Sequence, residues 1–134
     1  HLRIDPKRSA LMKKVRQKNT SPEIAVRKLL HRLGYRFRLH RKELPGRPDI
    51  VLPGRKKAIF VHGCFWHQHP NCDRATIPKT RTDFWKNKFE KNEERDRRKI
   101  VELKGLDWRV LVVWECETRN EQKIERTLSS FLET

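Results

Sequence analysis

Residues 108–114, which read Trp-Arg-Val-Leu-Val-Val-Trp, form a nearly continuous apolar run. Such a run is typical of a strand that is buried in a sheet. A second apolar run, Ala-Ile-Phe-Val, lies upstream at 58–61, and residues 82–104 between the two predict a long helix whose polar middle, 91–99, faces solvent or a ligand. A strand, a helix and a strand in this order predict a right-handed crossover that makes the two strands parallel neighbours.

A helix is expected before this unit. Thr20 and Glu23 have the spacing of a capping box, and Pro22 is tolerated in a first helical turn. Apolar side chains then recur at helical spacing up to Gly34, a candidate C-cap. Residues 20–33 therefore predict an amphipathic helix.

The remaining segments complete an α/β fold. Apolar and basic residues alternate over 35–39, which is typical of a half-buried strand with a basic face. Residues 50–52 and 58–61 flank a Pro53-Gly54 turn and predict a β-hairpin. Residues 124–132 predict a final amphipathic helix. The fold class is α/β, with a mixed sheet flanked by helices.

The charge of the chain is concentrated near its start. The sequence has 134 residues and a net charge of +16, and residues 1–42 contain 14 Lys and Arg but only two acidic residues. This block predicts a polyanionic partner, and four Trp and six Phe argue against a purely disordered cationic chain. We expect nucleic acid rather than an anionic membrane surface, with residues 1–19 as a basic N-terminal arm and 20–134 as a single domain.

The cellular location is inferred from what the sequence lacks. No window approaches the roughly 18–20 apolar residues that a membrane span needs, and no secretory signal opens the chain. We therefore expect a soluble, cytoplasmic protein. The chain begins at His1 rather than Met, so we also expect further residues upstream.

Three cysteines and a histidine have the spacing of a metal site. Cys64, His69 and Cys72 lie within nine residues, and Cys116 follows the buried strand 108–114. Three thiolates and one imidazole form a common structural zinc set, and a reducing compartment disfavours a disulfide. For Cys64, His69 and Cys72 together, zinc is favoured over unrelated thiols, whereas Cys116 alone is more simply explained as a small apolar filler. Zinc would pin an irregular segment, 63–78, to the end of a strand.

Asp49, His62 and His67 are candidates for hydrolytic chemistry. Asp49 lies where a loop meets the strand 50–52, and His62 ends the next strand. A carboxylate at such an edge can hold Mg²⁺, and imidazole can accept a proton near neutral pH. Spacing alone leaves open that Asp49 ends a turn and that both histidines are structural.

Five ordered motifs change that balance, and they strongly resemble those of the bacterial very-short-patch repair endonucleases. The motifs are Pro45–Asp49 (PGRPD), Phe60–His67 (FVHGCFWH), Thr80–Trp85 (TRTDFW), Lys91–Arg98 (KNEERDRR) and Trp108–Cys116 (WRVLVVWEC). The resemblance covers about residues 8–118. It implies a variant of the restriction-endonuclease-like fold and a nick 5′ to the thymine of a T:G mismatch left by deamination of 5-methylcytosine.

The resemblance also implies roles for single residues. Asp49 and the carbonyl of Val61 would hold Mg²⁺, and Val61 stands where the family pattern has Thr. His67 would activate water with His62 as its second histidine. Glu23 matches an acidic residue near the site, which competes with its capping role. The residues that match the zinc ligands are Cys64, His69, Cys72 and Cys116, with one extra residue between His69 and Cys72.

The resemblance further implies how DNA is bound. Phe65, Trp66 and Trp85 on one side and Met12 on the other would act as apolar wedges at the mismatch, with Lys88 and Asn92 as further DNA-binding residues. We expect a monomer that acts on double-stranded DNA at the nucleoid and is functionally linked to a cytosine-5 methyltransferase. Phe60-Val61-His62 fits the family's lack of the ExK tail found in related nucleases.

Three alternative hypotheses assign the chain to other functional classes of protein. A zinc-stapled nucleic-acid-binding module without catalysis would use the same charge, aromatics and cluster. A restriction-type nuclease would cut intact duplex and need two active sites or a dimer. A basic protein that only docks on ribosomal RNA has no support beyond its charge.

Overall fold

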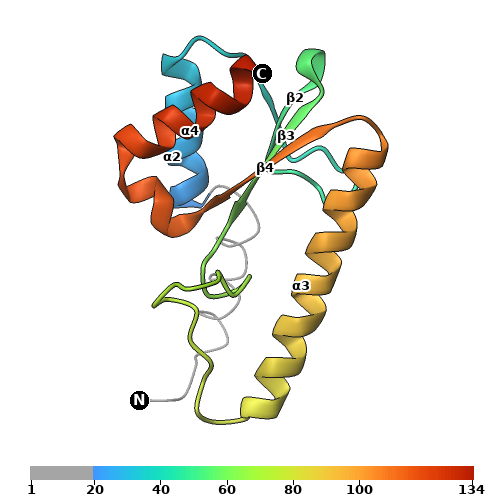
Figure 1. Cartoon of the computed structure of the whole chain (residues 1–134), viewed down its shortest axis with the longest axis vertical. Coiled ribbons are helices and arrows are strands. Elements are labelled where there is room, and N and C mark those ends of the chain that lie inside the picture. Colours follow the sequence, from blue (N-terminus) through green and yellow to red (C-terminus); the bar gives the residue numbers. More distant parts are fainter. Residues whose placement is uncertain (1–19) are drawn as a thin grey trace.

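The computed structural model describes residues 20–134, which are built around one four-stranded sheet (Figure 1). Residues 1–19, and with them the predicted arm and Met12, lie outside the described residues. The elements in chain order are α2 (Ser21–Arg32), β1 (Arg38–Leu39), β2 (Ile50–Leu52), the 3-10 helix η1 (Pro53–Arg55), β3 (Lys57–His62), α3 (Thr82–Gly105), β4 (Arg109–Trp114), the 3-10 helix η2 (Glu115–Arg119) and α4 (Glu121–Glu133).

The sheet is mixed, as the sequence predicts. Its order is β1-β2-β3-β4, with antiparallel pairing at the first two contacts and parallel pairing between β3 and β4. The helix α3 makes the connection between these two parallel strands. Their register aligns Lys57 with Arg109 at one end and His62 with Trp114 at the other. The predicted parallel pairing of strands 58–61 and 108–114 is therefore confirmed.

Strand alternation divides the core between the two faces of the sheet. Ile59 and Val113 pack with α2 and α4 on one face. Phe60 and Val112 pack with Leu103 of α3 on the other. Figure 1 shows α2 and α4 together on one side and α3 running along the opposite side. His62 and Trp114 have the same parity as Phe60 and Val112, so the register brings both to the α3 face at one end of the sheet.

Two local predictions need correction. The strand expected over 35–39 is only Arg38–Leu39, because β2 is three residues long and offers partners to those two residues alone. Tyr35 and Phe37 instead pack against the core below α2 and α4. The expected Pro53-Gly54 turn is the 3-10 helix η1, and the residue with positive φ (53°) is Lys56.

The start of α2 resolves the competing roles of Glu23. The Thr20 Oγ1 accepts a hydrogen bond from the Glu23 backbone N–H at 3.3 Å, which caps the helix. The Glu23 carboxylate contacts Arg27 and His40, so Glu23 can serve both the helix start and a site. Among residues 20–134, no helix is long and apolar enough to cross a membrane.

Candidate active site and metal cluster

Asp49 directly precedes β2 and is hydrogen-bonded to β3 and to the residue that follows β1. Its Oδ2 accepts a hydrogen bond from the Val61 backbone N–H at 2.7 Å, and its carbonyl accepts one from the His40 N–H at 3.1 Å. Burial raises the pKa of Asp49 to about 6, and the nearby charge of Glu23 adds to the increase. A buried carboxylate with a raised pKa is a group whose charged form calls for a cation.

Glu23 lies beside Asp49. Its side chain is buried, its carboxylate accepts a hydrogen bond from His40 Nε2 at 2.9 Å, and Arg27 forms an ion pair with the same oxygen. Glu23, His40 and Asp49 each offer a ligand atom within 4.8 Å of the others. The acidic residue predicted near the site is therefore placed beside Asp49.

His62 and His67 form a stacked pair next to this carboxylate group. Their ring centroids lie 3.9 Å apart and their planes differ by 5°. His67 Nδ1 lies 2.6 Å from Asp96 Oδ2 on α3. Because a carboxylate only accepts, Nδ1 is the donor in this hydrogen bond, which leaves Nε2 as the ring nitrogen able to accept a proton. Burial lowers the pKa of His62 to about 3, so this ring is neutral at pH 7.

Sequence reasoning missed Asp96. The residue lies within the motif 91–98, between Arg95 and Arg97, where a carboxylate is easily explained as a solvated partner of its neighbours. It reaches His67 because α3 crosses the sheet on the face that carries His62. The sequence feature that could have revealed Asp96 was the polar middle of this helix, because that stretch was predicted to face solvent or a ligand.

The candidate catalytic residues line one hollow of about 800 Å³. Asp49, His62, His67 and Asp96 all line it, together with basic side chains that include Arg47 and Arg95. A second hollow of about 810 Å³ begins on the other side of His67 and is lined by Phe65, Trp66, Lys88 and Asn92. His67 therefore lies between a hollow with carboxylates and a hollow with aromatic rings.

The aromatic residues predicted as wedges form a cluster of their own. Phe65 packs edge-on against Trp66, with ring centroids 4.8 Å apart, and against the buried Phe89 at 5.3 Å. Trp85 lies 6.1 Å from Trp66 and carries the Lys88 ammonium 5.7 Å from its ring. The cluster joins the 63–81 loop to the start of α3, and Phe65, Trp66 and Trp85 are each partly exposed.

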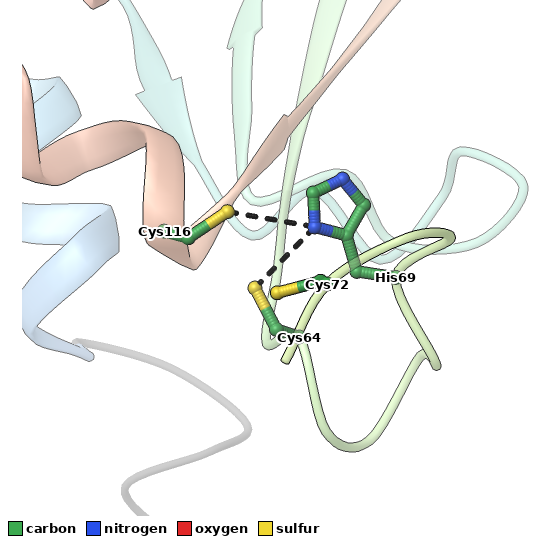
Figure 2. Close-up of side chains that lie close together, drawn as sticks. All are labelled: Cys64, His69, Cys72 and Cys116. Atoms are coloured by element: carbon green, nitrogen blue, oxygen red, sulfur yellow. Dashed lines mark hydrogen bonds between the residues drawn. The ribbon is translucent and has the colours of Figure 1, made fainter. Parts of the chain in front are cut away.

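All four predicted zinc ligands come together (Figure 2). Cys64, His69, Cys72 and Cys116 offer ligand atoms within 4.8 Å of one another. His69 Nδ1 lies 3.7 Å from Cys64 Sγ and 3.5 Å from Cys116 Sγ. A tetrahedron with the usual Zn–S and Zn–N bonds has a sulfur-to-nitrogen edge of about 3.5 Å. The cluster therefore has the dimensions of a zinc site.

The burial of Cys64 bears on how a cation would be held in the cluster. Burial raises the pKa of the Cys64 thiol to about 12, so a thiolate at this position needs a positive charge beside it. The predicted irregular segment is confirmed as well, because no helix or strand occurs between His62 and Thr82. The Cys64 N–H donates to Glu115 Oε1 at 3.3 Å, which ties the start of this loop to the end of β4.

This chain is similar to known mismatch endonucleases and nicking enzymes. Residues 4–74 match the family model of DNA mismatch endonuclease Vsr. The chain is 53% identical over 132 residues to the type II nicking enzyme V.XorIIP of Xanthomonas oryzae pv. oryzae, covering 98% of this chain and 96% of that protein. It is 46% identical over 117 residues to DNA mismatch endonuclease Vsr of Escherichia coli K12, covering 87% and 74% respectively.

A solved structure supports the fold. The catalytic domain of the homing endonuclease I-Bth0305I superimposes with a TM-score of 0.59 over 84% of this chain and 94% of that domain. At 24% identity this similarity shows the fold alone, and it confirms the predicted restriction-endonuclease-like core. The family match and the curated relatives establish that this chain belongs to the Vsr family of DNA mismatch endonucleases and is a DNA-hydrolysing enzyme.

Proposed function

We propose that this endonuclease nicks one DNA strand 5′ to the thymine of a T:G mismatch, with Mg²⁺ at Asp49 and zinc in the Cys64–His69–Cys72–Cys116 cluster. The observation that carries the proposal is the hydrogen bond between His67 and Asp96. The His67 Nδ1 is held by Asp96, and within residues 20–134 no hydrogen bond occupies its Nε2, in a hollow that also contains Asp49. Hydrolysis of a phosphodiester needs a positioned base that takes a proton from water and a carboxylate that holds a metal ion beside the phosphate.

The residues divide the chemistry between them. His67 Nε2 accepts the proton of the attacking water, and Asp96 stabilises the charged ring that results. His62 stays neutral and packs its ring against the face of the His67 ring. Asp49 and the Val61 carbonyl would hold Mg²⁺, which supplies positive charge at the phosphate in the transition state. Glu23 keeps a second carboxylate beside Asp49.

The aromatic cluster supports mismatch selection. Phe65 and Trp66 line the hollow on one side of His67, and Trp85 packs against them. Separating two stacked base pairs costs least where pairing is already defective. Side chains inserted at that step would therefore bind a mismatch more tightly than a matched pair. Lys88 and Asn92 line the same hollow, which supports their predicted role in DNA binding.

The type II nicking enzymes among the relatives support a nick rather than a double-strand cut. The predicted functional link to a cytosine-5 methyltransferase and the monomeric state belong to the same proposal. A monomer suits a nick because one active site cuts one strand. The competing hypothesis is a nuclease that cuts intact duplex. Cleavage of matched and mismatched substrates separates the two hypotheses.

The test is cleavage of three substrates by four proteins. Supercoiled plasmid, a matched duplex and a T:G duplex are incubated with Mg²⁺ or with EDTA. We expect the wild-type protein to nick only the T:G duplex, on the thymine strand, and only with Mg²⁺. Asp49→Asn and Asp96→Asn should lose about 10²–10⁴ in nicking rate, with T:G affinity within a few-fold of wild type.

Asp107→Asn is the matched control. Asp107 is an exposed acid before β4 with a φ of 68°, a conformation that Asn adopts as readily as Asp. It should nick at the wild-type rate. Equal cutting of matched and mismatched duplexes would contradict the mismatch assignment, and full activity of Asp49→Asn would remove Asp49 from the metal site.

A further inference from the structure

Four aromatic rings form a continuous row from the metal cluster to the catalytic histidines. The His69 ring stacks on the Trp114 indole, with centroids 4.2 Å apart and planes at 14°. The indole meets His62 edge-on at 5.3 Å and 76°. His62 then stacks on His67 at 3.9 Å. One end of the row is a predicted zinc ligand, and the other end is the ring held by Asp96.

The orientation of His62 depends on this row. Its side chain is 7% exposed, and within residues 20–134 no hydrogen bond holds its ring. The rings of Phe60, His67 and Trp114 contact it instead. A ring without a hydrogen-bonding partner is oriented by packing alone, so loss of one contacting ring frees it to rotate. Trp114 is the contact that comes from the neighbouring strand, opposite His62 in the register of β3 and β4.

Trp114 is in turn fixed by the cluster. Cys116 follows it by two residues, and the His69 ring covers one face of its indole. The Trp114 backbone N–H donates to Glu117 Oε1 at 2.8 Å, which holds the strand end against η2. Opening of the cluster would release His69 from the indole while leaving the strand pairing intact.

We infer that Trp114 is a positioning residue that couples the Cys64–His69–Cys72–Cys116 cluster to the His62–His67 pair. The cluster then does more than hold the loop, because its occupancy sets the orientation of the ring on which His67 rests. The coupling also acts in reverse, since the stacked indole keeps His69 in its ligating position. This inference rests on the proposed role of His67 as the base.

The test compares two substitutions of Trp114 with a matched one at Trp108. Trp114→Phe keeps an aromatic ring, and Trp114→Leu removes it. Trp108 precedes the same strand and packs on the same face of the sheet, against the core around Phe60 and Leu103. Trp108→Leu therefore reports the cost of losing a tryptophan from that face at the end far from the site.

Two quantities are measured on zinc-loaded protein. The first is the rate at which the chromogenic chelator 4-(2-pyridylazo)resorcinol withdraws zinc without DNA present. The second is kcat and KM for nicking of a T:G duplex. We expect Trp114→Leu to release zinc at least ten-fold faster and to lose at least ten-fold in kcat, with KM within about two-fold. Trp114→Phe should stay within three-fold of wild type in both.

Trp108→Leu should lower the melting temperature while leaving zinc release and kcat within two-fold of wild type. Three results would overturn the inference: wild-type kcat and zinc release in Trp114→Leu, equal losses in Trp114→Phe and Trp114→Leu, or equal losses in Trp108→Leu. A purified protein without zinc would also overturn it. Failure of the wild-type protein to nick T:G would instead contradict the proposed function, and the release rates would still report on contact between Trp114 and the cluster.

Discussion

Burial of Asp49 destabilises the fold when its carboxylate is charged. Its pKa rises from 3.8 to about 6 on folding, mainly because it is buried. The folded state therefore binds this proton more tightly than the unfolded state does. Stability falls as pH rises through the window from about 4 to 6, and the full cost, about 3 kcal/mol, is present at pH 8.

Asp49→Asn should remove that cost. Without added Mg²⁺, we expect the variant to be more stable than wild type by about 3 kcal/mol at pH 8 and by about half of that at pH 5. Urea denaturation at both pH values measures the difference, and subtracting one protein from the other cancels titrations that they share. A constant difference between pH 5 and pH 8 would show that Asp49 has an ordinary pKa.

Single residues differ in how far the sequence predicts them. Asp49 and His67 stand beside apolar strands and in irregular sequence, where a polar group needs an explanation. Asp96 stands among charged neighbours on a helix, and its partner is 29 residues away in the chain. Its role follows from the path of α3 over the sheet, which a charge pattern does not encode. The capping residue Thr20, in contrast, acts within its own turn and was predictable.

At the scale of elements, β4 was predictable because its apolar run is nearly continuous, and α3 because no Pro or Gly interrupts residues 82–104 between their apolar ends. β1 was overestimated because its extent depends on the length of its partner. The register of β3 also buries Lys57, which lies just before the apolar run. Its side chain is 3% exposed, and its Nζ donates to the carbonyls of Phe131 at 2.7 Å and Thr134 at 2.9 Å. This ammonium joins the sheet to the last turn of α4.

Lys57→Met should test that link. Methionine keeps the apolar volume but leaves the α4 carbonyls without their donor, and a lost buried hydrogen bond to a charged group costs about 1.5–3 kcal/mol. We expect a lower free energy of unfolding by that amount, measured by urea denaturation, with T:G affinity unchanged. Lys123→Met, at an exposed position of α4, serves as the control and should stay within about 0.5 kcal/mol of wild type. Equal stability of the two variants would show that Lys57 contributes nothing to the docking of α4.

For the whole molecule, two separate contributions to DNA binding are expected. The net charge of +16 attracts any duplex, and this contribution is independent of sequence and weakened by salt. The aromatic cluster between the 63–81 loop and α3 adds a contribution that depends on the mismatch. Figure 1 shows the first half of α3 and the loop that precedes it both extending past the same end of the sheet. The two contributions therefore differ in how they depend on salt and on the mismatch.

Binding at several salt concentrations should separate them. Plots of log affinity against log salt should have the same slope for T:G and matched duplexes, because the number of phosphate contacts is the same. The two lines should be separated by a vertical offset, which is the extra affinity for the mismatched duplex. Trp66→Ala should shrink the offset by about ten-fold or more in affinity without changing either slope, since stacking of one base on an aromatic ring contributes about 1–3 kcal/mol.

Trp66→Phe keeps a ring at the same position and should retain most of the offset. Fluorescence anisotropy with labelled duplexes, in EDTA to prevent nicking, gives the affinities, and circular dichroism with thermal melting checks the fold of each variant. A full offset in a folded Trp66→Ala protein would show that Trp66 is only a packing residue between Phe65 and Trp85. A change in slope would show instead that the substitution displaces basic residues from the phosphates, because only the number of neutralised phosphates sets that slope.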